Sequence, residues 1–165
     1  MKTSGFDDRD ELTAVVRDAD AVSYLVTIAA GRRLAAAADV PAVTEVLERL
    51  LLDDADTAVC QEIADALLQR RDIHGLRLVL AALAAANRPS FPESTIADHL
   101  YGAVASDPRW LAEQEPQELI EQFQELLHDP SEQVREQARS LLSGLRADAC
   151  TSRLAPAYLD DGFAR

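Results

Sequence analysis

Residues 50–70, LLLDDADTAVCQEIADALLQR, decide the expected fold. An apolar triplet runs directly into aspartates, and a second segment with helical apolar spacing follows at once. Val59, Ile63 and Leu67 recur at four-residue intervals, which places them on one face of a helix. Aspartate favours turns and accepts hydrogen bonds from free N–H groups at a helix start, so Asp56 is the expected N-cap of the second helix. The stretch therefore predicts two antiparallel helices joined by a short acidic turn.

The same joint returns 75 residues later, in the stretch LLHDPSEQVREQARSLLSGL that begins at residue 126. Three apolar positions of the first stretch fall at this offset on apolar positions of the second: Val59 on Val134, Ile63 on Ala138 and Leu67 on Leu142. This offset equals two helical hairpins of about 37 residues each, close to the length of known helical repeats. The chain is therefore expected to repeat one hairpin unit.

Other helix starts are marked by a capping aspartate or by a proline in the first turn. We expect such starts at Asp39, Asp72 and Pro116, and a loop in the proline-rich segment NRPSFPES (87–94). No stretch keeps the alternation of a strand. The sequence predicts an all-α fold, an α-α superhelix of about eight helices in stacked antiparallel hairpins, because each hairpin alone buries only one face.

We expect residues 10–38 to be helical, with a break near Asp18-Ala19-Asp20. Gly31 is expected to interrupt the helix or to lie at a close helix contact. One face is predicted to be buried from apolar spacing: Val22, Leu25, Val26 and Ala29.

The joint at residues 126–142 resembles the HEAT-repeat (HEAT/armadillo-like) family. That family has an apolar pair, an Asp-Pro turn, a Val-Arg step, a small residue and a Leu pair, which here are matched by Asp129, Pro130, Val134, Arg135 and Ala138. The joint at 51–68 departs from the pattern, with Ala55 in place of proline and Cys60 in place of arginine. The resemblance covers about 50–86 and 115–145. It implies a stack of helical hairpins and carries no catalytic activity.

Length and charge limit the function classes. With 165 residues, we expect a single domain over 1–165, with a frayed start at 1–9 and a C-terminal cap or tail at 148–165. The net charge of −13 leaves no basic footprint for nucleic acid and disfavours anionic membranes, but it is compatible with a basic protein partner. The start has no apolar signal region and no stretch is long enough to span a bilayer, so we expect a cytoplasmic protein.

Few residues suggest catalysis or metal binding. His74, His99 and His128 lack neighbours at metal-ligand spacing, and the acidic run lacks the glycine and spacing of a calcium loop, so we expect no metal and no cofactor. Cys60 lies near a helix start, where a thiol can be activated, but a small half-buried thiol on a helix flank is the favoured interpretation. No catalytic motif is present, and we expect a protein that is not an enzyme.

Acidic residues gather instead between Leu111 and Glu136, where only Arg135 opposes them. Two interpretations stay open for this strip: a solvated face, or a docking surface for a basic partner. Phe91, at the tip of the proline-rich loop, either anchors a partner or folds back onto a helix. The candidate partner-binding residues are Glu113, Glu115, Glu118, Glu121, Glu125, Asp129, Glu132 and Phe91.

Two functions fit these features. The first is a small acidic adaptor or regulatory module that binds another protein. The second is an immunity-type protein that neutralises a basic toxin or nuclease by presenting acids in place of phosphates. The second predicts a tight, salt-sensitive, one-to-one complex.

Overall fold

The computed structural model describes residues 9–53, 55–88, 95–106 and 116–152. These ranges hold eight helices and no strand, which confirms the predicted all-α class. The helices are α1 (Arg9–Asp18), α2 (Tyr24–Ala35), α3 (Pro41–Leu51), α4 (Thr57–Leu68), α5 (Ile73–Ala86), α6 (Ile96–Ser106), α8 (Pro116–Leu126) and α9 (Glu132–Ser152). Predictions that concern 1–8, Phe91, Glu113, Glu115 and 153–165 lie outside the described residues.

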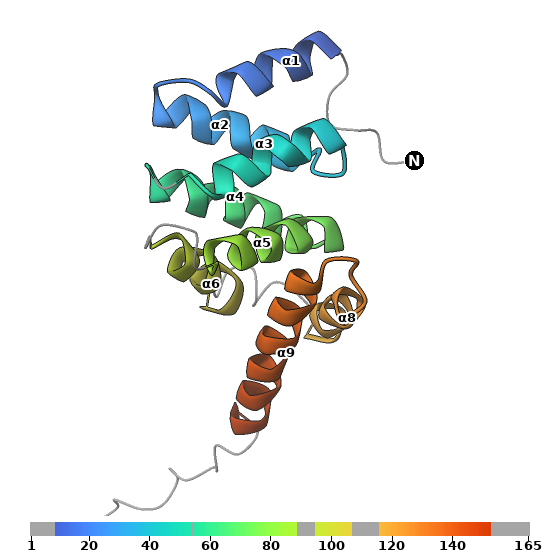
Figure 1. The fold of residues 1–165 in the computed structure, drawn as a ribbon. Helices are drawn as coiled ribbons and strands as arrows, with labels where there is room; N and C mark the ends of the chain where they lie inside the picture. The colour runs from blue at the N-terminus through green and yellow to red at the C-terminus, as the bar shows by residue number, and fades with distance from the viewer. Residues whose placement is uncertain (1–8, 54, 89–94, 107–115, 153–165) are drawn as a thin grey trace, which may run out of the picture.

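Consecutive helices form hairpins, and the first three hairpins stack (Figure 1). Helix α4 packs against both α2 and α6, so the second helices of these hairpins form one layer. Helix α3 packs against α5 on the other side of the stack. Stacking joins the apolar faces of neighbouring hairpins into one core, because no hairpin can cover its own face.

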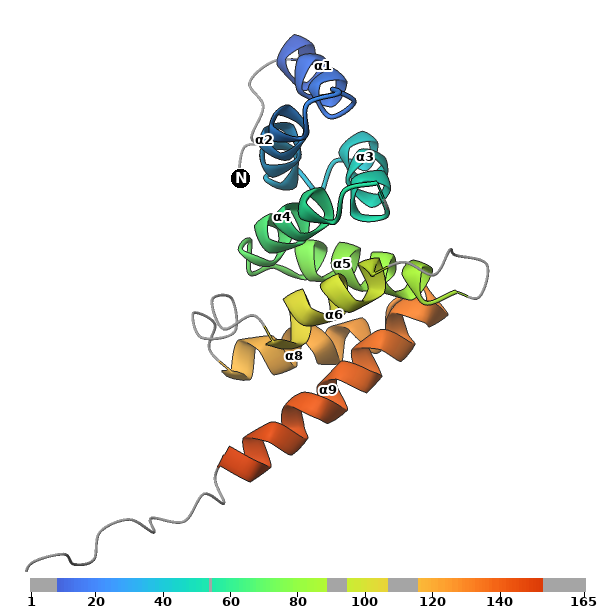
Figure 2. The ribbon, with the colours of Figure 1, turned by 90° about the vertical axis from the view of Figure 1, so that its left-hand side faces the viewer.

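The last hairpin departs from this order. Helix α9 packs against α5 and α8, and it runs obliquely away from the stack (Figures 1 and 2). It continues to Ser152, so the expected tail at 148–165 begins within a helix rather than after one. A regular superhelix through the whole chain stays a prediction.

The predicted repeat spacing is reproduced at the helix boundaries. The bounds of α3 and α8 differ by 75 residues at both ends, Pro41–Leu51 against Pro116–Leu126. Helices α4 and α9 also begin 75 residues apart, at Thr57 and Glu132. The 75-residue offset therefore relates α3 to α8 over their full lengths and relates the starts of α4 and α9.

The predicted apolar stripes of α4, α8 and α9 form the core. Ile63, Leu67, Phe123 and Ala138 have no exposed area, and Val134 is 1% exposed. Alanine and leucine dominate the interior, so the helices approach closely, as the small number of aromatic residues predicts. Phe123 is among the largest buried side chains of the described residues.

The predicted buried face of α2 is wrong. Val22 lies before the helix and is fully exposed, and Leu25 and Val26 are 62% and 41% exposed. The opposite side of α2 is buried instead, because Gly31 lets it approach α4: a Cβ added there would lie 2.6 Å from Ile63 Cδ1. The expectation of a close helix contact at Gly31 is confirmed.

Two of three predicted aspartate caps are confirmed. Asp56 accepts a hydrogen bond from Ala58 N, and Asp72 accepts one from Gly75 N. Asp39 does not cap α3, because Val40 occupies the N-cap position without a side-chain bond. One Asp39 carboxylate oxygen lies 3.9 Å from a guanidinium nitrogen of Arg70 instead.

Candidate functional site

Glu118, Glu121 and Glu125 are exposed along α8, on the side away from buried Leu119 and Phe123. We call these three glutamates the α8 acidic strip. Their spacing of three and four residues puts them on one face of the helix. Glu132, in the first turn of α9, is exposed as well.

The α8 acidic strip has little opposing charge. Residues 116–136 contain six acidic residues and one arginine, Arg135. The Arg135 guanidinium donates to the carbonyl oxygens of Asp129 and Pro130, at 2.6 and 3.1 Å. Within the described part of the chain, no ion pair involves the strip, and Glu121 accepts only an amide hydrogen bond from Gln117 at 3.0 Å.

Exposed acids of the first two hairpins are arranged differently. Three of them pair with an arginine on another helix or connection: Glu11 with Arg33, Asp20 with Arg49, and Glu62 with Arg32. The α8 acidic strip differs from these three acids because none of its carboxylates has an ion pair in the described residues. Like charges at this spacing cost the helix a few tenths of a kcal/mol per pair.

Asp129 does not belong to the exposed acids, contrary to the prediction. Its side chain is only 5% exposed and pairs with Arg77 of α5, with Nε–Oδ2 and Nη2–Oδ1 distances of 2.6 and 3.2 Å. The amide of Ser131 donates to Oδ1 at 2.8 Å. The α8–α9 turn faces α5, so the carboxylate is directed into the fold rather than toward solvent.

These contacts attach the last hairpin to the stack. Besides the Arg77–Asp129 pair, Gln122 Nε2 donates to the carbonyl oxygen of Arg71 at 3.0 Å. Arg71 lies in the α4–α5 connection with a positive φ of 56°. The α8 acidic strip is thus held on a scaffold and does not sit on a free helix.

The Arg77–Asp129 pair predicts a pH dependence of stability. Burial disfavours the charged carboxylate, but the hydrogen bonds from Arg77 and Ser131 outweigh it and hold the pKa of Asp129 below its usual 3.8. A lowered folded-state pKa stabilises the fold above pH 3.8, and this contribution is lost as the pH falls through the folded-state value.

We expect Asp129→Asn to lower the free energy of unfolding by about 1–2 kcal/mol at pH 7. The deficit relative to the native chain should shrink toward pH 3, because protonation removes the same interaction from the native chain. Urea unfolding at pH 7, 5 and 2.5 measures this difference. Glu136→Gln, at an exposed position of α9, serves as control. A deficit that is constant with pH would contradict the role of this ion pair.

A pocket of about 410 Å³ opens beside the α8 acidic strip, between the start of α5 and the α8–α9 turn. We call it the joint pocket. Its walls combine apolar side chains, two imidazoles, the Arg77–Asp129 pair and one glutamate of the strip: Ile73, His74, Arg77, Glu125, Leu126, His128, Asp129 and Pro130. The spacing of the histidines in the sequence did not indicate that two of them share a pocket. The described residues contain no cluster of three or more groups suited to hold a metal ion.

A second groove, of about 500 Å³, lies between α2 and α4. The Arg32–Glu62 ion pair and Arg70 contribute to its walls. Alanines line the rest of it together with Asp65 and Gln69, so acids and arginines balance there. This balance gives the groove no preference for a partner of either charge.

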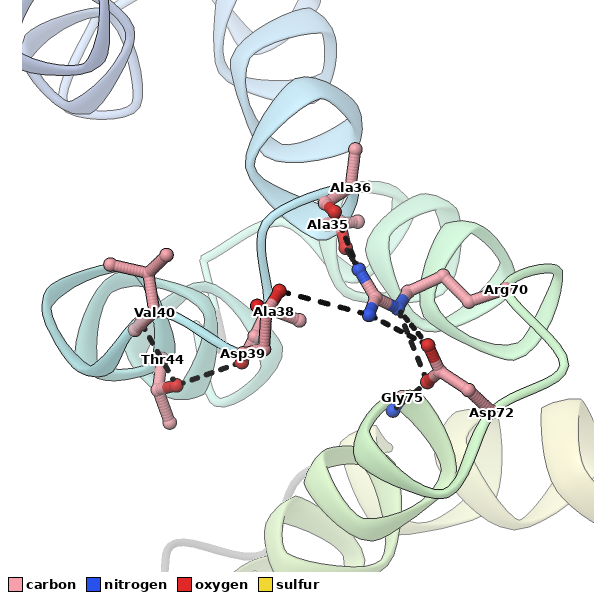
Figure 3. Close-up of polar contacts among 9 residues, drawn as sticks. All are labelled: Ala35, Ala36, Ala38, Asp39, Val40, Thr44, Arg70, Asp72 and Gly75. Atoms are coloured by element: carbon pink, nitrogen blue, oxygen red, sulfur yellow. Dashed lines mark hydrogen bonds and ion pairs between the residues drawn. The ribbon is translucent and has the colours of Figure 1, made fainter. Parts of the chain in front are cut away.

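Arg70 connects three helices at one end of this groove (Figure 3). Its Nη1 donates to the carbonyl oxygens of Ala35 and Ala36, at 2.7 Å each, where α2 ends. Its Nε and Nη2 donate to Asp72 Oδ2 at 3.0 and 2.7 Å, and Asp72 caps α5. The Arg70 side chain is 16% exposed. Arg70 therefore places its charge at the carbonyl end of α2 and not at the end of α4, the helix that it follows.

Cys60 is more deeply buried than the half-buried thiol that was favoured from the sequence. Its side chain has no exposed area, and burial, with a smaller contribution from the charge of Asp53, raises the pKa of the thiol to about 12. A thiol of this kind carries almost no thiolate at neutral pH. Cys60 lines neither the joint pocket nor the groove between α2 and α4.

One further surface was not recognised from the sequence. Four of the five large hydrophobic side chains exposed in the described residues lie within one short segment at the start of α2: Val22, Tyr24, Leu25 and Val26. Apolar patches on a monomer surface often mark interaction sites. The apolar spacing along a helix does not show which of its sides the neighbouring helices cover. For this reason Val22, Leu25 and Val26 were predicted to be buried.

None of the described helices combines the length and the apolar character needed to cross a lipid bilayer. A scan against protein-family models and searches of curated proteins and of solved structures found no match to the chain.

Proposed function

We propose that the chain is a non-enzymatic protein-interaction module that binds a basic protein partner through the α8 acidic strip. The observation that carries this proposal is the uncompensated charge of Glu118, Glu121 and Glu125. These carboxylates face solvent without an ion pair in the described part of the chain, while Glu11, Asp20 and Glu62 of the first two hairpins each pair with an arginine.

The attachment of α8 to α5 supports the same function. The Arg77–Asp129 pair and the Gln122–Arg71 hydrogen bond fix the strip relative to the stack. A rigid surface loses less conformational entropy on binding than a mobile one. Complementary charge would also speed association with a basic partner, and this effect falls with ionic strength.

The test is charge reversal of the strip. Glu118, Glu121 and Glu125 are replaced together with lysine, and capture of partners from cell lysate is compared with the native chain by mass spectrometry. The control changes the net charge equally at scattered exposed positions on three helices, Glu45, Asp98 and Glu136 to lysine. We expect the strip variant to lose its partner by a factor of at least about ten, and the control to keep it.

Circular dichroism verifies that both variants keep their helix content. If capture falls equally in the two variants, binding depends on the net charge of the chain and not on the strip, which contradicts the proposal. If capture survives reversal of the strip, the proposal is refuted. The immunity-type alternative stays a narrower prediction. It requires that the captured partner is a toxin or nuclease domain, bound one to one and inhibited by the chain.

A further inference from the structure

We propose that the joint pocket is the specificity site of this surface and receives an arginine side chain from the basic partner. This inference rests on the proposed function, and it specifies that the partner residue recognised by the surface is an arginine. The pocket adjoins the strip, because Glu125 belongs to both. A partner lying along α8 would therefore reach the pocket with one of its side chains.

The apolar walls suit the aliphatic part of arginine. Ile73 begins α5, Leu126 ends α8, and Pro130 lies in the turn that follows, so the three meet from different elements. Long basic side chains place their methylene groups against apolar surface and keep the charged group at a polar rim. A volume of about 410 Å³ leaves room for one such side chain with its guanidinium group.

The charged groups that line the pocket, Glu125, Asp129 and Arg77, sum to one negative charge, which favours a cation. Arg77 and Asp129 neutralise each other through two hydrogen-bonded contacts, at 2.6 and 3.2 Å. Glu125 is the remaining carboxylate, and it has no ion pair in the described residues. The pocket thus presents one unopposed negative charge at its rim. A carboxylate accepts two parallel hydrogen bonds from a guanidinium group.

The two imidazoles favour arginine over lysine. His74 from α5 and His128 from the α8–α9 turn both line the pocket. His128 Nδ1 lies 3.2 Å from the carbonyl oxygen of Gln124, and this contact orients the imidazole ring. A planar guanidinium group stacks on aromatic rings, whereas an ammonium group is a compact, strongly hydrated point charge.

Two peptides of equal charge test the inference. Fluorescein-labelled Lys-Gly-Lys-Arg-Lys-Gly-Lys and its counterpart with a central lysine are titrated with the full chain, and binding is followed by fluorescence anisotropy. The electrostatic attraction to the strip is the same for both peptides, because they carry the same charge. The ratio of their affinities therefore measures how strongly the pocket prefers arginine over lysine. We expect the arginine peptide to bind about tenfold more tightly.

The matched variants are Glu125→Gln and Glu118→Gln, which remove one charge each from α8. Only Glu125 lines the pocket. We expect Glu118→Gln to weaken both peptides alike and to keep their ratio. Glu125→Gln should reduce the ratio toward one. His128→Ala, at an exposed ring, should also reduce it while retaining helix content.

Other outcomes would separate this inference from the proposed function. Equal affinity of the native chain for both peptides, lost on reversal of the strip, would overturn the arginine pocket and leave the docking surface intact. The same loss of ratio in Glu118→Gln as in Glu125→Gln would also overturn the pocket. Preferential binding of a matched peptide with glutamates in place of the lysines would overturn both.

Discussion

Replacing Gly75 with alanine is expected to lower the free energy of unfolding by about 3 kcal/mol, at the upper end of typical overpacking effects. A Cβ at this position would lie 2.2 Å from the carbonyl oxygen of Leu67 and 3.0 Å from its carbonyl carbon. These are backbone atoms of α4, which cannot rotate away as a side chain can. Helix α5 would have to shift, and this shift would strain the 2.9 Å hydrogen bond from Gly75 N to Asp72.

Two other glycines provide matched controls for urea unfolding. A Cβ at Gly102 of α6 meets nothing within 4 Å, so Gly102→Ala should stabilise the fold by about 0.5–1 kcal/mol through helix propensity. Gly31→Ala should fall between the two, because the nearest atoms belong to the flexible end of the Ile63 side chain. A stability of Gly75→Ala equal to that of Gly102→Ala would show that α4 and α5 do not approach closely.

The second large effect is expected at Arg70. Arg70→Met should cost about 2–3 kcal/mol, because it removes the guanidinium donor from two helix-end carbonyl groups of α2 and from Asp72. Within the described residues, only the backbone donors Ala38 N, to Ala35 O, and Gly75 N, to Asp72, remain. The cost is limited by the exposure of Asp72, whose side chain is 38% exposed and can be hydrated in the variant. Arg70→Lys should recover only part of the loss, since one ammonium group cannot span both sides of the contact.

The control for Arg70 is Arg88→Met, at an exposed residue just after α5, where we expect a change within about 0.5 kcal/mol. A double-mutant cycle with Asp72→Asn separates the two sides of the contact. Coupling between Arg70 and Asp72 should account for about half of the loss, and the carbonyl groups of Ala35 and Ala36 for the rest. Equal stability of Arg70→Met and Arg88→Met would refute the bridging role.

Arg70 also influences the proposed binding surface. The Asp72 cap that it supports holds the start of α5, and Ile73 and His74 line the joint pocket from that start. Loss of the cap is therefore expected to loosen the pocket as well as the stack. The peptide titrations should use exposed positions, such as Glu125 and His128, for this reason.

Most helix boundaries could be predicted from the chain alone, because they depend on residues within one turn. Asp56 and Asp72 cap the helices that follow them, and Pro116 begins α8. The exposure of Glu118, Glu121 and Glu125 followed from their position opposite the apolar stripe of Phe123. Here spacing was sufficient, since α8 has one clear apolar side.

Other predictions failed where the answer depends on a distant segment. Asp129 was predicted as an exposed acid, but its partner Arg77 lies 52 residues earlier in the chain. The buried face of α2 was misassigned because four of its five buried residues are alanine, glycine or threonine. Small residues give a weak apolar signal in the sequence, yet they permit the close approach of α4.

The all-helical class, the hairpin joints and the 75-residue offset between α3–α4 and α8–α9 were thus determined by local capping and periodicity. The tertiary structure alone decided which carbonyl groups Arg70 reaches, 34 and 35 residues away, and which two histidines share a pocket with Glu125. The physical reason is that hydrogen bonds at a helix start involve neighbours in sequence. Contacts between stacked hairpins depend instead on which helix faces pack against each other, and these faces belong to segments that are far apart in the sequence.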